Sequence, residues 1–441
     1  MADQTKKELR QLMMYQIFVR NYSREGTFAM VERDLERIRS LGTDIIYFLP
    51  IHPIGEKNRK GSLGSPYAIR DYRAINPEYG TLEDFRRLVE SIHAHGMKCI
   101  IDIVYNHTAP DSELVMHHPE WFYHREDGSF GNRVGEWTDI IDLDYAQKGL
   151  WEYQIDTLKF WAEIVDGFRC DVAPMVPIAF WERARREVEV VRPGLLWLAE
   201  SIHPEFLTEL RSRGLTAHSD GEIFRAFDVS YDYDIYGEWE NYLCGRSGLS
   251  GYLEALRRQE WIYPDNYIKL RFLENHDQPR VRFLVSDEKM LRNITAFSFF
   301  QKGMAFIYAG QEFGASHLPS LFDRDTVCLS PEKGTDLSML IRQLSALKKS
   351  SIFTDSSYQV QCNCRDICVA VHTRQEQMAV GVFSLRGESG TVQVPLADGN
   401  YQNELDRKQI EVIHGLLHCS GEPVWIQTPE EEKRPAVLPG E

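Results

Sequence analysis

The sequence predicts an α/β protein built on a (β/α)8 TIM barrel, with a short inserted excursion after the third strand and a C-terminal antiparallel β-domain. Three observations predict this fold. Eight short apolar runs have the character of strands, and helical segments separate them. The runs are apolar throughout, which is typical of parallel strands covered on both faces. Polar and ionisable residues directly follow several runs, as they do at the functional end of such a barrel.

The eight runs are rich in strand-forming residues and recur along most of the chain. In chain order they are residues 14–19, 45–49, 98–104, 166–170, 195–199, 226–230, 268–273 and 304–308. Between Thr27 and Gly42, apolar positions recur at helical spacing and a glycine marks the end. Thr81 and Asp84 form a helix-start motif, and residues 147–164 predict another helix. Each strand but the last therefore leads towards a helical segment.

Two stretches depart from this alternation and divide the chain. Residues 107–145 are rich in His, Trp, Asp and Gly with weak periodicity, which indicates an insertion between a strand and its helix. Near the C-terminus, runs such as 367–371 and 378–383 are separated by turn residues, which predicts an antiparallel β-sandwich. The predicted parts are a barrel half at 1–106, an inserted subdomain at 107–145, the second barrel half at 146–350 and the β-domain at 351–441.

Composition and charge narrow the classes of partner. The chain has 441 residues and is 43% hydrophobic, which is enough for a large core. Its net charge of −16 disfavours nucleic acid and anionic membrane as partners, because both need a cationic face. No apolar run has the length of a membrane span, and the N-terminal residues lack the apolar core of a signal peptide. We therefore expect a cytoplasmic protein, while its oligomeric state stays open.

The cysteines do not indicate a metal site. The sequence has eight, including Cys362, Cys364 and Cys368 close together. Their C-x-C-x3-C spacing is not one that zinc sites use. We expect free, reduced thiols, as in a cytosolic protein.

The fourth apolar run ends in an arginine and an aspartate, Arg169 and Asp171. Side chains alternate along a strand, so these two are expected on the same face. There the guanidinium would hold the carboxylate ionised and fix its direction. An isolated pair of this kind is more often a structural salt bridge, so its meaning depends on neighbouring strands.

Four of the predicted strands end in polar or ionisable side chains. These are Asp102, Asn106 and His107 after the third strand, Arg169 and Asp171 on the fourth, Glu200 after the fifth, and Glu274, His276 and Asp277 after the seventh. Any one of them fits a structural role, which is the better interpretation of Asp102 alone. Several carboxylates, two histidines and an arginine at one rim of a barrel instead predict a functional site.

In order and position, the four motifs resemble the four signature regions of the α-amylase family of glycoside hydrolases. Residues 14–18 also resemble its first strand, Ser65-Pro66-Tyr67 its second loop, and residues 308–312 its eighth strand. The resemblance covers about residues 13–315 and implies a retaining enzyme on a (β/α)8 barrel.

The resemblance implies a role for each catalytic carboxyl group. Asp171 matches the family's nucleophile and Glu200 its general acid/base. Retaining glycosidases place two such groups about 5–5.5 Å apart. Arg169 would keep Asp171 ionised, whereas Glu200 needs a raised pKa to stay protonated. Asp277 matches the third carboxylate, which binds sugar hydroxyls and helps to distort the ring.

Substrate-binding residues follow from the same resemblance. His107 and His276 match hydrogen-bond donors to the sugar bound at the reacting bond, and Tyr67 matches the aromatic platform beneath it. Arg280 is predicted to lie near the same site. Taken alone, each of these side chains is more often structural; their places in matching motifs reverse that expectation.

Two features depart from the family. Many α-amylases carry Lys-His a few residues after the nucleophile, where this chain has Pro174-Met175. The acceptor side is therefore expected to differ. The inserted segment is also short, and its aromatic residues either stack on further sugars or pack its own core. These residues are Trp121, Phe122, Tyr123 and Trp137.

The sequence does not decide whether the protein binds a structural calcium ion. The inserted segment often supplies calcium ligands in this family, and Asn106 and Asp142 match two ligand positions. Calcium takes about six or more oxygen ligands, and the sequence does not reveal the others. Asn106 also fits a hydrogen-bonding role in its loop. We expect no required cofactor.

The sequence therefore predicts a retaining hydrolase of α-glucosidic bonds, α-1,4 bonds in maltooligosaccharides or soluble starch, with an α-glucan oligosaccharide as its substrate. One alternative is a glucanotransferase, which shares every catalytic residue and differs in its acceptor. Another is an enzyme of the same family acting on α-1,6 bonds, sucrose or trehalose. From a different class, a non-catalytic scaffold protein on the same barrel is less favoured, because the three carboxylates Asp171, Glu200 and Asp277 are all present.

Overall fold

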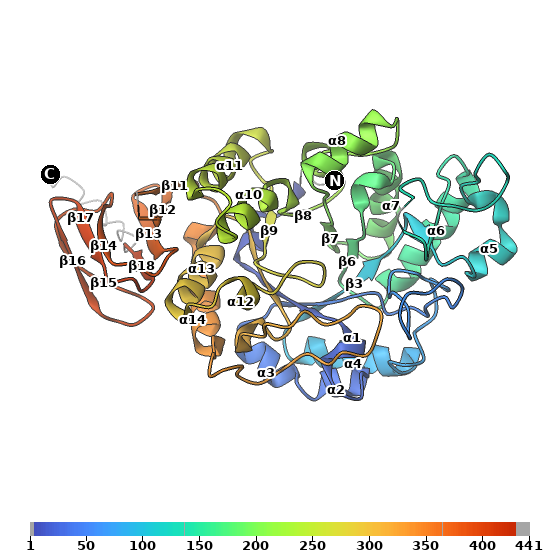
Figure 1. Ribbon diagram of the computed structural model, residues 1–441, viewed down its shortest axis with the longest axis horizontal. Coiled ribbons are helices and arrows are strands. Elements are labelled where there is room, and N and C mark those ends of the chain that lie inside the picture. The colour runs from blue at the N-terminus through green and yellow to red at the C-terminus, as the bar shows by residue number, and fades with distance from the viewer. Residues whose placement is uncertain (1–3, 136, 364, 429–441) are drawn as a thin grey trace, which may run out of the picture.

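A closed parallel barrel forms the centre of the computed structural model, which describes residues 4–135, 137–363 and 365–428 (Figure 1). Its strands neighbour one another in the order β1-β10-β9-β8-β7-β6-β3-β2. They are β1 (Met13–Ile17), β2 (Ile45–Phe48), β3 (Lys98–Ile103), β6 (Gly167–Cys170), β7 (Leu196–Ala199), β8 (Val229–Tyr231), β9 (Lys269–Arg271) and β10 (Met304–Tyr308). All of their residues except Lys98 are buried, as the continuous apolar runs predict, and the predicted barrel is confirmed.

The sixth strand begins later than the sequence predicts. The apolar run 226–230 straddles a helix end and the strand β8. Ala226 N–H and Phe227 N–H both donate to the carbonyl of Ile223, at 2.9 and 3.1 Å, and so close the turn after helix α9 (Asp220–Ile223). An apolar run by itself does not reveal such a change of backbone direction.

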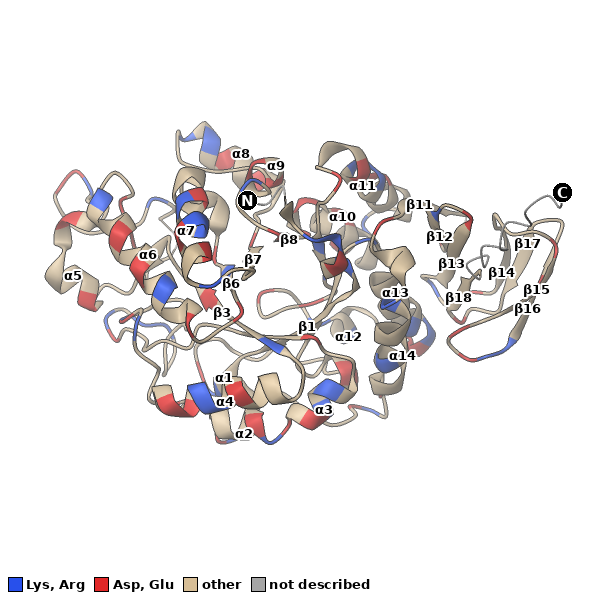
Figure 2. Ribbon diagram, turned by 180° about the vertical axis from the view of Figure 1, so that it is seen from behind, with Lys and Arg blue, Asp and Glu red and all other residues tan. Residues whose placement is uncertain are grey.

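Helices surround the barrel, as Figure 1 shows. They include α1 (Val19–Tyr22), α2 (Phe28–Glu32), α3 (Leu35–Ser40), α4 (Leu82–Ala94), α6 (Lys148–Ala162), α7 (Ile178–Val191), α8 (Pro204–Ser212), α10 (Tyr233–Leu243), α11 (Leu249–Ile262), α12 (Val281–Leu284), α13 (Glu288–Phe300) and α14 (Ser338–Lys348). The capping box of α4 is formed, with Asp84 N–H donating to Thr81 Oγ1 at 3.1 Å and Thr81 N–H to Asp84 Oδ2 at 2.9 Å. The single helix expected between Thr27 and Gly42 is instead broken into α2 and α3 at Asp34. Figure 2 shows acidic and basic residues interspersed along these helices.

The inserted segment lies at the opposite end of the molecule from the C-terminal sheets (Figure 1). It contains α5 (Glu113–His117), the 3-10 turn η3 (Pro119–Trp121) and a two-stranded ladder. In that ladder β4 (His107–Thr108) pairs antiparallel with β5 (Ile141–Asp142), so that His107 lies opposite Asp142. The ladder ties the end of the insertion to its beginning, next to the third barrel strand.

Two four-stranded antiparallel sheets form the C-terminal part, in the orders β11-β12-β13-β18 and β14-β17-β16-β15. Their bounds are β11 (Ser357–Cys362), β12 (Ile367–Arg374), β13 (Gln377–Ser384), β14 (Gly390–Gln393), β15 (Gly399–Gln402), β16 (Gln409–Ile413), β17 (Leu416–Cys419) and β18 (Val424–Gln427). An apolar cluster that includes Val380 and Leu417 joins the two sheets. The first sheet also packs on the barrel, because the rings of Trp425 and Phe300 lie 4.6 Å apart.

The remaining expectations concern the cysteines and the membrane. Every cysteine in the described residues is a free thiol, and Cys362 lies opposite Cys368 on β11 and β12. Cys364 lies outside the described residues. Across the described ranges, no helix has the length and apolar character that crossing a membrane requires.

Candidate active site

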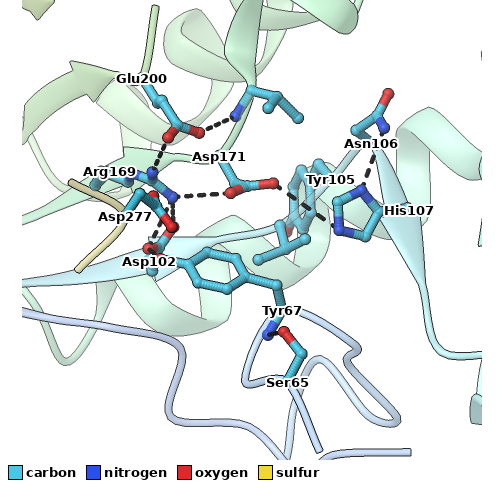
Figure 3. A network of polar contacts seen from close by, with 12 residues as sticks. Ser65, Tyr67, Asp102, Tyr105, Asn106, His107, Arg169, Asp171, Glu200 and Asp277 are labelled. Atoms are coloured by element: carbon cyan, nitrogen blue, oxygen red, sulfur yellow. Dashed lines mark hydrogen bonds and ion pairs between the residues drawn. The ribbon is translucent and has the colours of Figure 1, made fainter. Parts of the chain in front are cut away.

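Arg169 is the centre of the candidate site, where its guanidinium pairs with three carboxylates (Figure 3). Its Nη1 lies 2.8 Å from both oxygens of Asp102 and 3.0 Å from Asp171 Oδ1. Its Nη2 lies 2.7 Å from Glu200 Oε1, an ion pair without the alignment of a directed hydrogen bond. Arg169 and Asp171 therefore share a face of β6, as predicted, and one buried cation orients the two carboxyl groups expected to react.

The strand geometry explains this convergence. Strands β3, β6 and β7 are neighbours in the barrel, and Asp102 on β3 is the direct register partner of Arg169 on β6. Gly167 begins β6 where no side chain fits, because a Cβ there would lie 2.3 Å from the carbonyl oxygen of Leu196 on β7. The close approach of β6 and β7 brings Glu200, which directly follows β7, next to Arg169.

Asp102 supports the candidate site, although its motif taken alone favours an ordinary structural role. It is fully buried and accepts hydrogen bonds from Tyr47 Oη at 2.6 Å and Tyr67 Oη at 2.9 Å, besides its pairing with Arg169. The signal in the sequence is a single acid within the otherwise apolar run of β3. With Asp102 in place, the Arg169 side chain is anchored on the barrel side and Tyr67 is fixed above it.

Glu200 is held on its other side by a strained residue. Its Oε2 accepts the backbone N–H of Val172 at 2.8 Å. Val172 has φ +35° and ψ +44°, a left-handed conformation that a β-branched residue rarely adopts. Such strain persists only where the surrounding structure imposes it, and it clusters at functional sites. Here the left-handed turn directs the amide that follows Asp171 towards Glu200.

Burial shifts the pKa of both reacting carboxyl groups upward. Burial raises the pKa of Glu200 to about 8, although Arg169 opposes this shift, and Asp171 and Asp277 add to it. Burial likewise raises the pKa of Asp171 to about 7, despite the Arg169 guanidinium at 3.0 Å. For Glu200 the direction of the pKa shift agrees with the expected role of a proton donor. For Asp171, Arg169 lowers the pKa as expected, but desolvation acts in the opposite direction and outweighs that attraction.

Tyr67, His276 and Asp277 form one unit beside the two carboxyls. The rings of Tyr67 and His276 stack, with centroids 5.4 Å apart and planes 12° apart. Gln16 Nε2 donates to His276 Nδ1 at 2.9 Å, which places the ring proton on Nε2. That nitrogen faces Tyr67 Oη at 2.6 Å and Asp277 Oδ2 at 3.0 Å. Although burial opposes it, the interaction with His276 lowers the pKa of Asp277, whose side chain is 40% exposed.

His107 approaches the site from the inserted segment. Its Nε2 lies 4.0 Å from Asp171 Oδ2, and Asn106 Nδ2 donates to its Nδ1 at 3.2 Å. Burial lowers the pKa of His107 to about 4, so the ring is neutral at pH 7. A neutral ring with its proton on Nε2 offers a hydrogen-bond donor next to Asp171. This is the position in which the sequence predicts it.

Arg280 lies apart from this cluster. Its guanidinium is fully buried, where it donates to Glu274 Oε1 at 2.6 Å and to the carbonyl of Ala309 at 3.0 Å. It also lies 4.0 Å from the centre of the Tyr308 ring. These contacts fasten the loop after β9 to the end of β10. None of them is to the residues around Arg169, so the predicted role of Arg280 in substrate binding gains no support from them.

An apolar cluster continues from the side of Glu200 that is remote from Arg169. It contains Ile202, Leu210 and Ala217, with Val134, Val172, Met175, Phe206, Leu207 and Leu215 packed against them. Trp137 extends it, since its ring lies 6.4 Å from that of Phe206 and 5.9 Å from that of His107. Met175 therefore belongs to an apolar cluster, and its neighbour Pro174 is buried. Of the other aromatic residues in the insertion, Phe122 is buried in the core.

The predicted calcium positions do not form a cluster of metal ligands. Asp142 is 1% exposed, and its Oδ2 accepts the backbone N–H of Arg133 at 2.7 Å. Asn106 is used by His107 as described above. Within the described parts of the chain, no group of three or more His, Cys, Asp or Glu side chains has a geometry suited to a metal ion.

Comparisons with known proteins agree with the fold and with the motifs. The family model described as "Alpha amylase, catalytic domain" matches residues 16–351, and "Bacterial Alpha amylase C-terminal domain" matches residues 359–426. The crystal structure of an alpha-amylase from Lactobacillus plantarum is 48% identical, with a TM-score of 0.93 over 96% of this chain and 100% of that one. A noncanonic maltogenic alpha-amylase from Thermotoga neapolitana is 32% identical, with a TM-score of 0.85 over 96% and 99% of the two chains.

Curated relatives include enzymes with a transferase name. An alpha-1,4-glucan:maltose-1-phosphate maltosyltransferase of Cereibacter sphaeroides is 39% identical over 274 residues, which are 57% of this chain and 42% of that protein. This chain thus spans about two fifths of the length of the curated relatives that it matches. The catalytic-domain match, in contrast, extends over most of the chain. The chain belongs to the α-amylase family of glycoside hydrolases.

Proposed function

We propose that the protein is a retaining hydrolase that cleaves α-1,4-glucosidic bonds in maltooligosaccharides or soluble starch. One observation carries the proposal: Asp171 and Glu200 contact the two terminal nitrogens of the same buried guanidinium, that of Arg169. A double-displacement mechanism requires two carboxyl groups, one that attacks and one that donates a proton. Glu200 matches the family's proton donor and Asp171 its nucleophile, and burial raises the pKa of Glu200, as a proton donor requires.

In the first step Asp171 attacks the anomeric carbon of the sugar. A bond forms between a carboxylate oxygen and that carbon while the bond to the glycosidic oxygen breaks. Glu200 gives its proton to the departing oxygen, so the shortened chain leaves as a neutral alcohol. Arg169 orients the attacking group through the 3.0 Å contact with Asp171 Oδ1.

In the second step water replaces the departed chain. Glu200, now ionised, takes a proton from the water molecule as its oxygen attacks the anomeric carbon. The ester bond to Asp171 breaks, and both carboxyl groups return to their first state. Two displacements at the same carbon leave the product with the configuration of the substrate.

The surrounding groups suit a neutral, hydroxyl-rich ring. His107 presents a ring N–H next to the reacting Asp171, His276 presents one next to Asp277, and Asp277 presents an acceptor. Tyr67 supplies an aromatic ring held by His276 and Asp102. Sugar hydroxyls both donate and accept hydrogen bonds, and their C–H faces pack on aromatic rings. These features support an α-glucan oligosaccharide as substrate.

A chromatographic time course of products from maltoheptaose tests the proposal. We expect only shorter oligosaccharides, released in the α-configuration, because attack by water follows the first displacement. Product lengths distinguish internal from terminal cleavage. Parallel reactions with isomaltose, sucrose and trehalose test the other specificities of the family. The absence of turnover on every substrate would contradict the proposal and favour a non-catalytic protein.

Transfer to a second sugar is a second candidate activity, and the apolar surface beside Glu200 favours it. Glu200 protonates the leaving chain, so the groups beyond it face the leaving or acceptor sugar. There Met175 and Phe206 present partly exposed apolar side chains, and Pro174-Met175 stand where many α-amylases carry Lys-His. An apolar acceptor site binds a sugar face and holds water less well, and the name of the Cereibacter relative is that of a transferase.

Replacing Phe206 with alanine is expected to lower transfer more than hydrolysis. Loss of one aromatic contact, worth about 0.5–1.5 kcal/mol, should reduce the ratio of elongated to shortened products about 2- to 10-fold. The measurement is the same time course at high maltoheptaose concentration. The control is Trp261→Ala, an aromatic residue 71% exposed on α11. An unchanged ratio in Phe206→Ala would remove this surface from the acceptor site.

A further inference from the structure

The guanidinium of Arg133 lies at the position where the sequence suggests calcium ligands without settling whether calcium binds. Arg133, in the inserted segment, places its Nη1 3.5 Å from Asp142 Oδ2 and its Nη2 3.8 Å from Asp144 Oδ1. The same Nη1 donates to the carbonyl of Leu143 at 3.1 Å. One cation thus contacts three consecutive residues, two through carboxylates and one through its backbone.

Arg133 is itself fixed on several sides. Its backbone N–H donates to Asp142 Oδ2 at 2.7 Å, and its carbonyl accepts a hydrogen bond from Arg213 at the end of α8. Its guanidinium lies 4.6 Å from the centre of the Tyr123 ring, and its side chain is 29% exposed. Arg133 therefore connects two parts of the inserted segment with each other and with helix α8, which follows β7.

The residues that Arg133 holds are those that place His107. Asp142 pairs with His107 in the β4–β5 ladder, and Leu143 N–H donates to the carbonyl of Asn106 at 3.0 Å. His107 in turn lies 4.0 Å from Asp171. A shift of the 142–144 strand end would therefore move the imidazole relative to the nucleophile.

The donor set here does not suit calcium. The ion takes about six to eight oxygens, whereas the described residues offer two carboxylates at this junction, and Asp142 Oδ2 already accepts the Arg133 N–H. Asp142 Oδ1 is buried without a hydrogen-bond partner among the described residues. A cavity of about 350 Å³ opens beside Asn106, Arg133 and Asp142, so there is room for an ion. The nearby guanidinium charge and the small number of carboxylate ligands are what disfavour calcium.

We propose that Arg133 replaces a calcium ion at this junction, neutralising Asp142 and Asp144 and positioning His107, so that the fold of the inserted segment is independent of calcium. A guanidinium is suited to this task because its planar donors bind carboxylate and carbonyl oxygens together. In this chain a side chain thus supplies the positive charge that would otherwise come from solution.

Calcium and chelator titrations of the wild-type protein test the first half of the proposal. We expect the same midpoint of thermal unfolding in EDTA and in millimolar CaCl2, measured by scanning calorimetry. We also expect less than stoichiometric calcium in the purified protein by elemental analysis. A saturable increase in the midpoint with one calcium bound per chain, lost in Asp142→Asn, would overturn it. These readouts need no activity, so they are independent of the proposed function.

Substitution of Arg133 tests the positioning role. In Arg133→Ala we expect the unfolding midpoint to fall by about 2–4 °C and KM for maltoheptaose to rise several-fold, with a smaller change in kcat. Arg133→Lys, which keeps the charge but not the planar donors, should recover part of both losses. The matched control is Arg125→Ala, an exposed arginine of the same segment that bonds Phe130 O and Ser129.

Two outcomes contradict the positioning role. If Arg133→Ala behaves like Arg125→Ala in both unfolding and KM, the junction does not depend on Arg133. If Arg133→Ala loses stability but keeps the wild-type KM, its role is structural and does not extend to His107. Should Arg133→Ala fail to fold, Arg133→Lys and the calcium titration of the wild-type protein still decide the proposal.

Discussion

The Asp171→Asn variant is expected to hydrolyse maltoheptaose at least about 10⁴-fold more slowly than the wild-type protein, with its fold retained. Asparagine has nearly the same shape as aspartate, but its amide does not form the ester bond to the sugar. The fold should not suffer. Burial raises the pKa of Asp171 to about 7, which means that its ionised form is disfavoured in the folded chain. At pH 8 a neutral asparagine therefore costs no stability, and the unfolding midpoint should be equal or higher.

A distant aspartate provides the control for this experiment. Asp156 on α6 has a side chain that is 64% exposed and pairs with Lys159 at 3.5 Å. Asp156→Asn should keep wild-type turnover and stability. Turnover within tenfold of the wild type in Asp171→Asn, measured after removal of any wild-type contamination, would sink the assignment of the nucleophile.

The Glu200→Gln variant is expected to lose about 10²–10⁴-fold in kcat/KM on maltoheptaose, because a leaving sugar oxygen needs a proton. The loss should be much smaller on α-maltosyl fluoride, since fluoride leaves without protonation. Asp171→Asn should instead be inactive on both substrates. The comparison of two substrates therefore separates the proton donor from the nucleophile, and equal losses on both would contradict the role of Glu200.

The pH dependence gives a second test of the same residue. A general acid works only while protonated, and burial raises the pKa of Glu200 to about 8. The kcat/KM of the wild-type protein should therefore fall as the pH rises through about 8. In Glu200→Gln this descending limb should disappear, measured on α-maltosyl fluoride, where residual activity is highest. A limb that persists unchanged belongs to another group.

Several features of the site could be predicted from neighbouring residues alone. Strand alternation places Arg169 and Asp171 on one face, and in the structure the guanidinium of Arg169 contacts the carboxylate of Asp171. The eight apolar runs predict the barrel because strands that are buried on both faces need apolar side chains on both faces. Only the sixth strand begins later than its apolar run, since Ala226 and Phe227 belong to the turn before it. The family motifs add the order of the reacting groups along the chain.

Other features depend on residues that lie far apart in the sequence. Asp102 contacts Arg169 across 67 positions, and Arg280 donates to the carbonyl of Ala309, 29 positions away, rather than to the carboxyl cluster. The left-handed Val172, which directs an amide to Glu200, has no signature in its own side chain. Such contacts follow from strand register and loop closure, which the local pattern does not contain.

The barrel, the β-domain and the chemical identity of the groups at the strand ends follow from the amino-acid sequence, because these depend on periodicity and residue type. The shifts in pKa of those groups and the contacts that support them follow from the packed structure. The pKa of Asp171 rises because the whole barrel end removes water from it, despite an adjacent arginine. Arg133 meets Asp142 and Asp144 only once the inserted segment folds back on itself. Desolvation and charge pairing act through space, so they become visible only when the packed chain is known.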